Sequence, residues 1–245
     1  MANKLLTDNL SAPLGGATAA KVDIYTGAGN LTIDRLTGGE QLLASGRLEY
    51  FEKQGPPDCE TNSSNGEATL TLKGEDPGRA WFRFPWQACN GAHEWQIHLN
   101  PAVRSDITAR SGGGNVKLDL AGMTVTRLAA DTGAGNLDVV LPDNAANLGV
   151  IAKTGAGNVT VNVGSGMAGS NALDAHSGAG NVVVRLPRGL AARIHASSGM
   201  GKIIVDPGFT EIDRRIYQSP GYDAAVDKVD ITAHSGAGNV SVDVR

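Results

Sequence analysis

The chain has 245 residues, 41% of them hydrophobic, which is enough for a sizeable core and argues against a wholly disordered chain. Its net charge of −4 and pI near 5.7 lack the basic footprint of a protein that binds nucleic acid or anionic membranes. No apolar run approaches the roughly 18 residues of a membrane-spanning helix. Glycine is the outlier, because 33 residues are about twice the average usage and show no collagen period.

Residues 1–19 are expected to form an N-terminal tail or cap ahead of one domain that covers residues 20–245. The first residues lead into polar sequence instead of the apolar core of a signal peptide. With neither a signal segment nor a membrane-spanning segment, the chain by itself is expected to be cytoplasmic.

From residue 20 onward the pattern Ser/Thr-Gly-x-Gly-Asn/Lys occurs seven times. Apolar residues alternate with period two on both sides of each copy, so each repeat is predicted to be strand, glycine turn, strand. From Ser111 to Ser198 the copies are 21, 22, 23 and 21 residues apart, whereas the first and last intervals are 85 and 37. The copies begin at Thr26, Ser111, Thr132, Thr154, Ser177, Ser198 and Ser235.

The glycines of each motif are expected to permit positive φ at a tight bend, and the Asn side chains to form a ladder on the surface. In sequence order Lys202 interrupts that ladder. The predicted structural turn residues are Gly27, Gly29, Asn30, Gly112, Gly114, Asn115, Gly133, Gly135, Asn136, Gly155, Gly157, Asn158, Gly178, Gly180, Asn181, Gly199, Gly201, Gly236, Gly238 and Asn239.

Residues 35–104 form an insertion near the N-terminal end that holds seven of the eleven aromatic residues. Strands are expected at 67–72 and 94–99, where they would widen one end of the repeat array while aromatic rings cover its open core. In the alternative, Trp81, Trp86 and Trp95 form a platform that binds a protein or an envelope glycan.

Two cysteines, Cys59 and Cys89, fall in the same insertion. They either form one disulfide or stay reduced, and their spacing matches no zinc template.

Two architectures fit the repeat: a parallel β-solenoid with about 21–23 residues per coil, or antiparallel hairpins in a sandwich. The outward columns favour the solenoid, because residues one repeat apart would then be neighbours about 4.8 Å apart. Asp131 would lie between Arg110 and Lys153, and Arg185 would lie beside Asp206. Such opposite charges help to specify the register.

A second break in the period covers residues 207–228. Its Pro207-Gly208 and Ser219-Pro220-Gly221-Tyr222 segments are turn signals. We expect a protruding loop before the final repeat.

Patterns that would carry chemistry are largely missing. His176 and His234 share a column, but Ser197 separates them in sequence order, so no metal site is expected. The carboxylates form no convincing acid/base pair, and the glycine motif lacks the features of a nucleotide-binding loop. No catalytic residue, metal or cofactor is predicted. One hydroxyl per repeat also makes a poor ice-binding array.

The repeat at 231–244, Ile-Thr-Ala-His-Ser-Gly-Ala-Gly-Asn-Val-Ser-Val-Asp-Val, resembles the bacterial putative-adhesin β-strand-repeat family. It is also similar to the C-terminal domain of cell-wall-active antibiotic response proteins, and the resemblance covers roughly 20–245. It implies a right-handed single-chain β-solenoid without enzymatic activity, located at the cell envelope and linked to stress sensing or surface interaction. Many members carry an acidic residue where this chain has Asn after the second glycine.

The expected function is therefore that of a non-enzymatic, adhesin-like or envelope-stress-associated protein that binds a protein or an envelope component. One alternative is a structural solenoid that self-assembles through its exposed ends into oligomers or filaments. The other is a β-helix carbohydrate-active enzyme.

Overall fold

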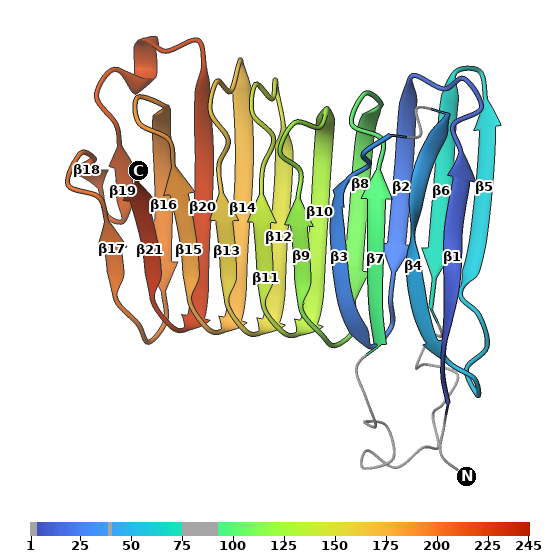
Figure 1. The fold of residues 1–245 in the computed structure, drawn as a ribbon. Coiled ribbons are helices and arrows are strands. Elements are labelled where there is room, and N and C mark those ends of the chain that lie inside the picture. The colour runs from blue at the N-terminus through green and yellow to red at the C-terminus, as the bar shows by residue number, and fades with distance from the viewer. Residues whose placement is uncertain (1–3, 39–40, 75–92) are drawn as a thin grey trace.

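The computed structural model describes residues 4–38, 41–74 and 93–245. These residues form two long β-sheets (Figure 1). They contain one short 3-10 helix, η3 (Tyr222–Ala224), and no α-helix. No helix in this part of the chain could therefore span a bilayer.

Sheet A has ten strands and sheet B eleven. In spatial order, sheet A consists of β1 (Leu5–Pro13), β4 (Leu42–Phe51), β7 (His93–Leu99), β3 (Gly29–Arg35), β9 (Val116–Asp119), β11 (Leu137–Val140), β13 (Val159–Asn162), β15 (Val182–Leu186), β21 (Val240–Val244) and β17 (Ile203–Val205). Starting from the opposite end, sheet B consists of β18 (Thr210–Asp213), β19 (Ile216–Gln218), β16 (Ala191–Ser198), β20 (Lys228–Ala237), β14 (Ser170–Ala179), β12 (Gly149–Ala156), β10 (Val125–Ala134), β8 (Arg104–Ser111), β2 (Ala19–Tyr25), β6 (Glu67–Lys73) and β5 (Asp58–Ser64).

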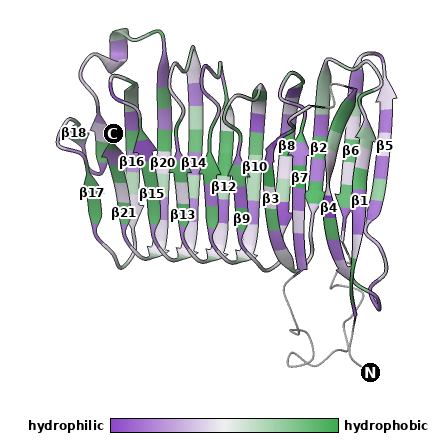
Figure 2. Ribbon diagram, viewed as in Figure 1, coloured by the Kyte–Doolittle hydropathy of each residue, from purple (hydrophilic) through white to green (hydrophobic). Residues whose placement is uncertain are grey.

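Each glycine motif joins a strand of sheet B to the next strand of sheet A, and equivalent strands of neighbouring repeats pair in parallel. The predicted register is confirmed in the regular region, where Asp131 pairs with both Arg110 and Lys153. Alternating apolar residues, such as Leu128 and Ala130, face the space between the sheets and are at most 1% exposed. Figure 2 shows the resulting alternation of polar and apolar residues along the strands.

The serine or threonine of the motif faces the interior. Thr132 Oγ1 donates to the carbonyl oxygen of Gly114 at 2.8 Å, and Thr154 Oγ1 donates to that of Gly135 at 2.9 Å. Six of the seven motif hydroxyls thus tie one repeat to the backbone of its neighbour, and within the described part of the chain only Thr26 Oγ1 has no such partner. A buried hydroxyl column cannot serve as an ice-binding surface.

The two glycines of a motif are needed for different reasons. Gly157 has a φ of +142°, which side chains rarely adopt, as predicted. Gly155 has no positive φ, yet a Cβ there would lie only 2.5 Å from the carbonyl oxygen of Gly133 in the neighbouring repeat. Close stacking of the backbones therefore requires this first glycine. The expectation of positive φ is confirmed for five motif glycines and wrong for the other nine; the five are Gly27, Gly114, Gly135, Gly157 and Gly180.

The repeats do not stack in sequence order at the C-terminal end. The last repeat, β20 and β21, lies between β14–β15 and β16–β17. Arg185 consequently pairs with Asp243, and the predicted pairing of Arg185 with Asp206 is wrong. The Asn ladder is uninterrupted, because Lys202 comes after Asn239 at its end, where the Lys202 amide donates to the Asn239 side chain at 2.9 Å.

The segment 207–228, predicted to be a protruding loop, connects β17 to the last repeat, which lies out of sequence order. It contains β18, β19 and η3, and β19 pairs antiparallel with β16 to extend sheet B. Because β19 pairs with one edge of β16, the last repeat pairs with the other edge, where β20 lies between β16 and β14.

At the N-terminal end, too, the strands do not stack in sequence order. The expected strands at 67–72 and 94–99 are confirmed as β6 and β7, and they pair in parallel with β2 and β3 on the outer side of that repeat. Antiparallel β5, β4 and β1 then continue the two sheets. Residues 5–13, expected to be a tail or cap, supply the edge strand β1.

Candidate interaction surface

The tryptophans singled out in the sequence do not form the predicted platform within the described residues. Trp95 lies on β7 with its side chain in the core, only 1% exposed, and its Nε1 donates to the carbonyl oxygen of Glu49 at 3.0 Å. Trp81, Trp86 and Cys89 lie outside the described residues. Cys59 is exposed on β5 with a free thiol. Trp95 is therefore a core residue rather than a surface contact.

The predicted turn glycines and asparagines line one edge of the repeat array and serve the backbone. The amide of Asn158, for example, donates to Asn136 Oδ1 at 3.0 Å, and Gly155 and Gly157 pack against the preceding turn. These residues hold the repeats together and offer no chemistry of their own.

A shallow open groove of about 600 Å³ crosses the outer face of sheet B, and the sequence analysis did not find it. Its floor includes Gly149 and Ile151 of β12 and Ala172 of β14. The groove exists because two small residues stand in an outward-facing column whose other members are charged. The column reads Lys21, Asp106, Arg127, Gly149, Ala172, Asp230 and Arg193 across neighbouring strands.

The fold itself does not require glycine at position 149. Gly149 pairs with Arg127 on one side and Ala172 on the other, its φ is not positive, and a Cβ added there would meet no atom within 4 Å. Glycine in a strand is destabilising relative to alanine by about 0.5–1 kcal/mol. A glycine in a strand often marks a bulge, a bend or a place where a ligand or another backbone approaches, and the register on both sides of Gly149 shows no bulge.

The two sides of the groove carry opposite charges. Arg127 on β10 is exposed on one side, and Asp230 on β20 is exposed on the other, with Asp174 of β14 nearby. Three strand spacings of about 4.8 Å separate β10 from β20, so the charged columns are about 14 Å apart. The surface therefore suits an elongated ligand with an apolar middle and both signs of charge.

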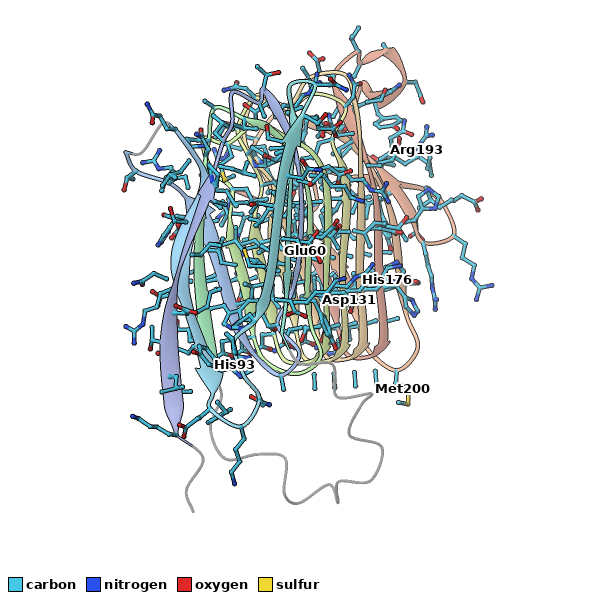
Figure 3. All side chains as sticks on the ribbon, turned by 90° about the vertical axis from the view of Figure 1, so that its right-hand side faces the viewer. Glu60, His93, Asp131, His176, Arg193 and Met200 are labelled. Atoms are coloured by element: carbon cyan, nitrogen blue, oxygen red, sulfur yellow. The ribbon has the colours of Figure 1, made fainter. Side chains whose placement is uncertain are left out.

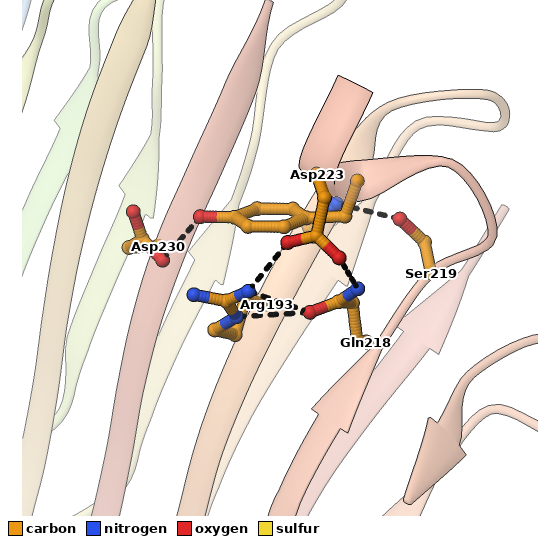
Figure 4. A network of polar contacts seen from close by, with 7 residues as sticks. Arg193, Gln218, Ser219, Asp223 and Asp230 are labelled. Atoms are coloured by element: carbon orange, nitrogen blue, oxygen red, sulfur yellow. Dashed lines mark hydrogen bonds and ion pairs between the residues drawn. The ribbon is translucent and has the colours of Figure 1, made fainter. Parts of the chain in front are cut away.

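A network of polar contacts fixes the acidic side of the groove (Figure 4). The Tyr222 hydroxyl donates to Asp230 Oδ1 at 2.6 Å, and the Arg193 guanidinium lies 4.4 Å from the centre of the Tyr222 ring. Arg193 Nη2 also donates to Asp223 Oδ1 at 2.9 Å and to Gln218 Oε1 at 2.8 Å. Burial, followed by the hydrogen bond to Asp230 and its negative charge, raises the pKa of Tyr222 to about 12.

Two histidines meet near the groove because the last repeat is inserted out of order. His176 and His234 are paired on β14 and β20, with ring centroids 5.7 Å apart. Ser197, expected between them, lies beyond His234 and contacts its Nδ1 at 2.8 Å. In Figure 3, His176 projects from the same side of the molecule as Asp131 and Arg193. The residues that the structure describes nevertheless contain no group of three or more His, Cys, Asp or Glu suited to a metal.

The carboxylates beside the groove do not have the surroundings of a catalytic pair. Asp174 lies 3.1 Å from His176 Nε2, and Asp230 accepts the Tyr222 hydroxyl. A general acid in a glycosidase is kept protonated by apolar surroundings, and neither carboxylate has them.

The described residues define an all-β repeat protein with long, mainly parallel sheets and an open groove on one sheet face. A family model described as the N-terminal domain of toast_rack, DUF2154, matches residues 1–162. This is about two thirds of the sequence, and the chain belongs to that family.

One solved structure has a similar fold over nearly the whole chain. A structure described as a putative cell adhesion protein from Clostridium sporogenes is similar with a TM-score of 0.67 and 21% identity, over 99% of this chain and 100% of that one. A putative adhesin from Bacteroides fragilis has a TM-score of 0.34 at 9% identity, over 100% of this chain and 98% of that one, a similarity too low to carry an argument. No curated protein matches the chain. The first similarity shows the shared fold alone, and the family match confirms the predicted β-strand-repeat family.

Proposed function

We propose that this protein is a non-enzymatic, adhesin-like interaction protein whose groove on sheet B binds a protein or an envelope component. Its framework is a β-solenoid in which each repeat forms one coil. Support comes from the strands of consecutive regular repeats, which alternate between the sheets and pair in parallel with the repeat before. Right-handed coils follow from the strong preference of parallel crossover connections.

The observation that carries the proposal is Gly149. A side chain at this position would occupy the groove without a clash, and a β-branched residue would favour the strand. Since neither backbone conformation nor packing requires glycine here, binding of a ligand in the groove is the proposed reason for it. The description of the similar Clostridium sporogenes structure as a putative cell adhesion protein points to adhesion. The cell envelope is the proposed location, with a role in stress sensing as a further part of the proposal.

Gly149→Thr tests this function, because it fills the groove floor while leaving the repeat turns unchanged. The probes are envelope vesicles and purified peptidoglycan from the native bacterium, immobilised for biolayer interferometry with the full chain in solution. Binding of Gly149→Thr to the fraction that retains the wild type should be at least tenfold weaker. Thr69→Val, on the outer face of β6 and away from the groove, is the control and should bind like the wild type.

Equal binding by Gly149→Thr and the wild type would place the contact elsewhere. Release of soluble sugar from the peptidoglycan would instead favour the carbohydrate-active alternative.

A further inference from the structure

Four strands form the edges of the two sheets: β1 and β17 in sheet A, and β5 and β18 in sheet B. Edge strands expose unpaired backbone groups, and proteins shorten, bulge or charge them to prevent pairing with other chains. The strand β17 has only three residues, and β18 has four with a register irregularity after Glu211. The pairing of β1 is irregular at Ala12 and ends at Pro13. The two edges at the C-terminal end are thus blunted, whereas β1 is irregular only at its last residue.

The strand β5 is neither short nor bulged, and its only charges are the carboxylates of Asp58 and Glu60. Its seven residues pair with β6 in an unbroken register and are all exposed. Its sequence, Asp-Cys-Glu-Thr-Asn-Ser-Ser, contains no proline, lysine or arginine. Within the described ranges, β5 pairs with β6 alone and forms the end of sheet B. Figure 3 views the molecule from this end, with Glu60 of β5 labelled.

The side chains of β5 are complementary to a second copy of the same strand. When two β5 strands run antiparallel and Thr61 faces Thr61 of the second copy, Glu60 faces Asn62 and Asp58 faces Ser64. No two carboxylates are then opposite each other. In a parallel, in-register pair each carboxylate would face its own copy, which is destabilising.

We infer that this protein forms a dimer in which β5 pairs antiparallel with β5 of a second copy, with Thr61 at the two-fold axis. Both faces of β5 are polar and exposed, so main-chain hydrogen bonds along about 24 Å of strand provide most of the contact. Such a small interface gives weak and reversible association. Because the edges at the opposite end are blunted, the assembly closes as a dimer and does not extend into a filament.

The symmetry has a consequence for binding that rests on the proposed function. A two-fold axis through paired edge strands is perpendicular to the sheets, so sheet B of both copies faces the same side. The groove lies between five and six strands from β5, which places the two grooves about 60 Å apart at about 4.8 Å per strand. A dimer would therefore present two grooves towards one surface and gain avidity.

The test uses Thr61, because a residue on the two-fold axis faces its own copy. Sedimentation velocity of the full chain over a concentration series should show a monomer–dimer equilibrium. Thr61→Lys and Thr61→Glu should each weaken dimerisation at least tenfold, because each places like charges opposite one another. An equimolar mixture of the two variants should restore the dimer. Ile212→Lys, a matched change at the exposed residue of edge strand β18, should dimerise like the wild type.

Circular dichroism should show that all variants keep the wild-type fold. A monomer at every concentration up to about 1 mM, an unchanged dimer in both Thr61 variants, or growth beyond the dimer would overturn the inference. Binding by Gly149→Thr is measured separately, so failure of the dimer and failure of the groove can be told apart.

Discussion

Gly149 lies at the start of β12 and Gly157 just beyond its end. The proposed function assigns Gly149 to binding, whereas the fold requires Gly157. Gly149→Ala adds a Cβ to open space and should raise the free energy of unfolding by about 0.5–1 kcal/mol, since the unfolded chain loses freedom. At Gly157 the φ is +142° and a Cβ would overlap the carbonyl oxygen of Gly135. Backbone strain of about 1–3 kcal/mol and overpacking of about 1–3 kcal/mol should together lower the stability of Gly157→Ala by about 2–6 kcal/mol.

Urea unfolding followed by circular dichroism measures both changes on one scale, and thermal unfolding provides a second. For a chain of this size about 1 kcal/mol corresponds to about 2–4 °C, so Gly149→Ala should melt about 1–4 °C higher and Gly157→Ala at least about 4 °C lower. If Gly149→Ala is destabilised as Gly157→Ala is, Gly149 serves the fold, and the argument for a binding groove fails.

Three further changes test other parts of the structure. Thr154→Val removes the buried hydrogen bond to Gly135 and should lower the free energy of unfolding by about 1–2 kcal/mol in urea titrations; an unchanged value would show that the hydroxyl column is dispensable. The pKa of Tyr222 is raised to about 12 from an ordinary value of 10.0, so stability should fall as pH rises from 10 to 12. Urea titrations across that range should show a smaller fall for Tyr222→Phe, and equal slopes would contradict the assigned hydrogen bond. Burial is the main cause that lowers the pKa of His93 below its ordinary 6.5. The contribution of His93 to stability should therefore be complete above pH 6.5 and decline below it. Melting temperatures between pH 7.5 and 5 should show a smaller decline for His93→Gln.

The sequence predicts the repeating unit well because period two and the glycine motif are local signals. The same signal could have placed Trp95 in the core, since Trp95, Ile97 and Leu99 share one face of their strand. The groove was also readable in outline: five residues before each motif, Gly149 and Ala172 interrupt a column of charged residues.

The order of the repeats at both ends could not be predicted in the same way. β20 carries an inward pattern that fits beside β14 and β16 equally well, so its place depends on the path of residues 207–228. The Tyr222 network depends on that path too, because it joins Arg193 to a tyrosine 29 positions later in the sequence. Contacts between residues so far apart in the chain produce no periodic pattern in the sequence.

The insertion of β20 and β21 between two earlier repeats also constrains the route by which the chain reaches its native state. During synthesis β16 and β17 emerge first, when β14 and β15 still offer a free edge of matching pattern. Either the nascent β16–β17 repeat waits undocked, or it docks prematurely and must later be displaced. The 18 residues 228–245 thus complete two repeats at once, and we expect residues 191–245 to fold cooperatively only once that segment is present.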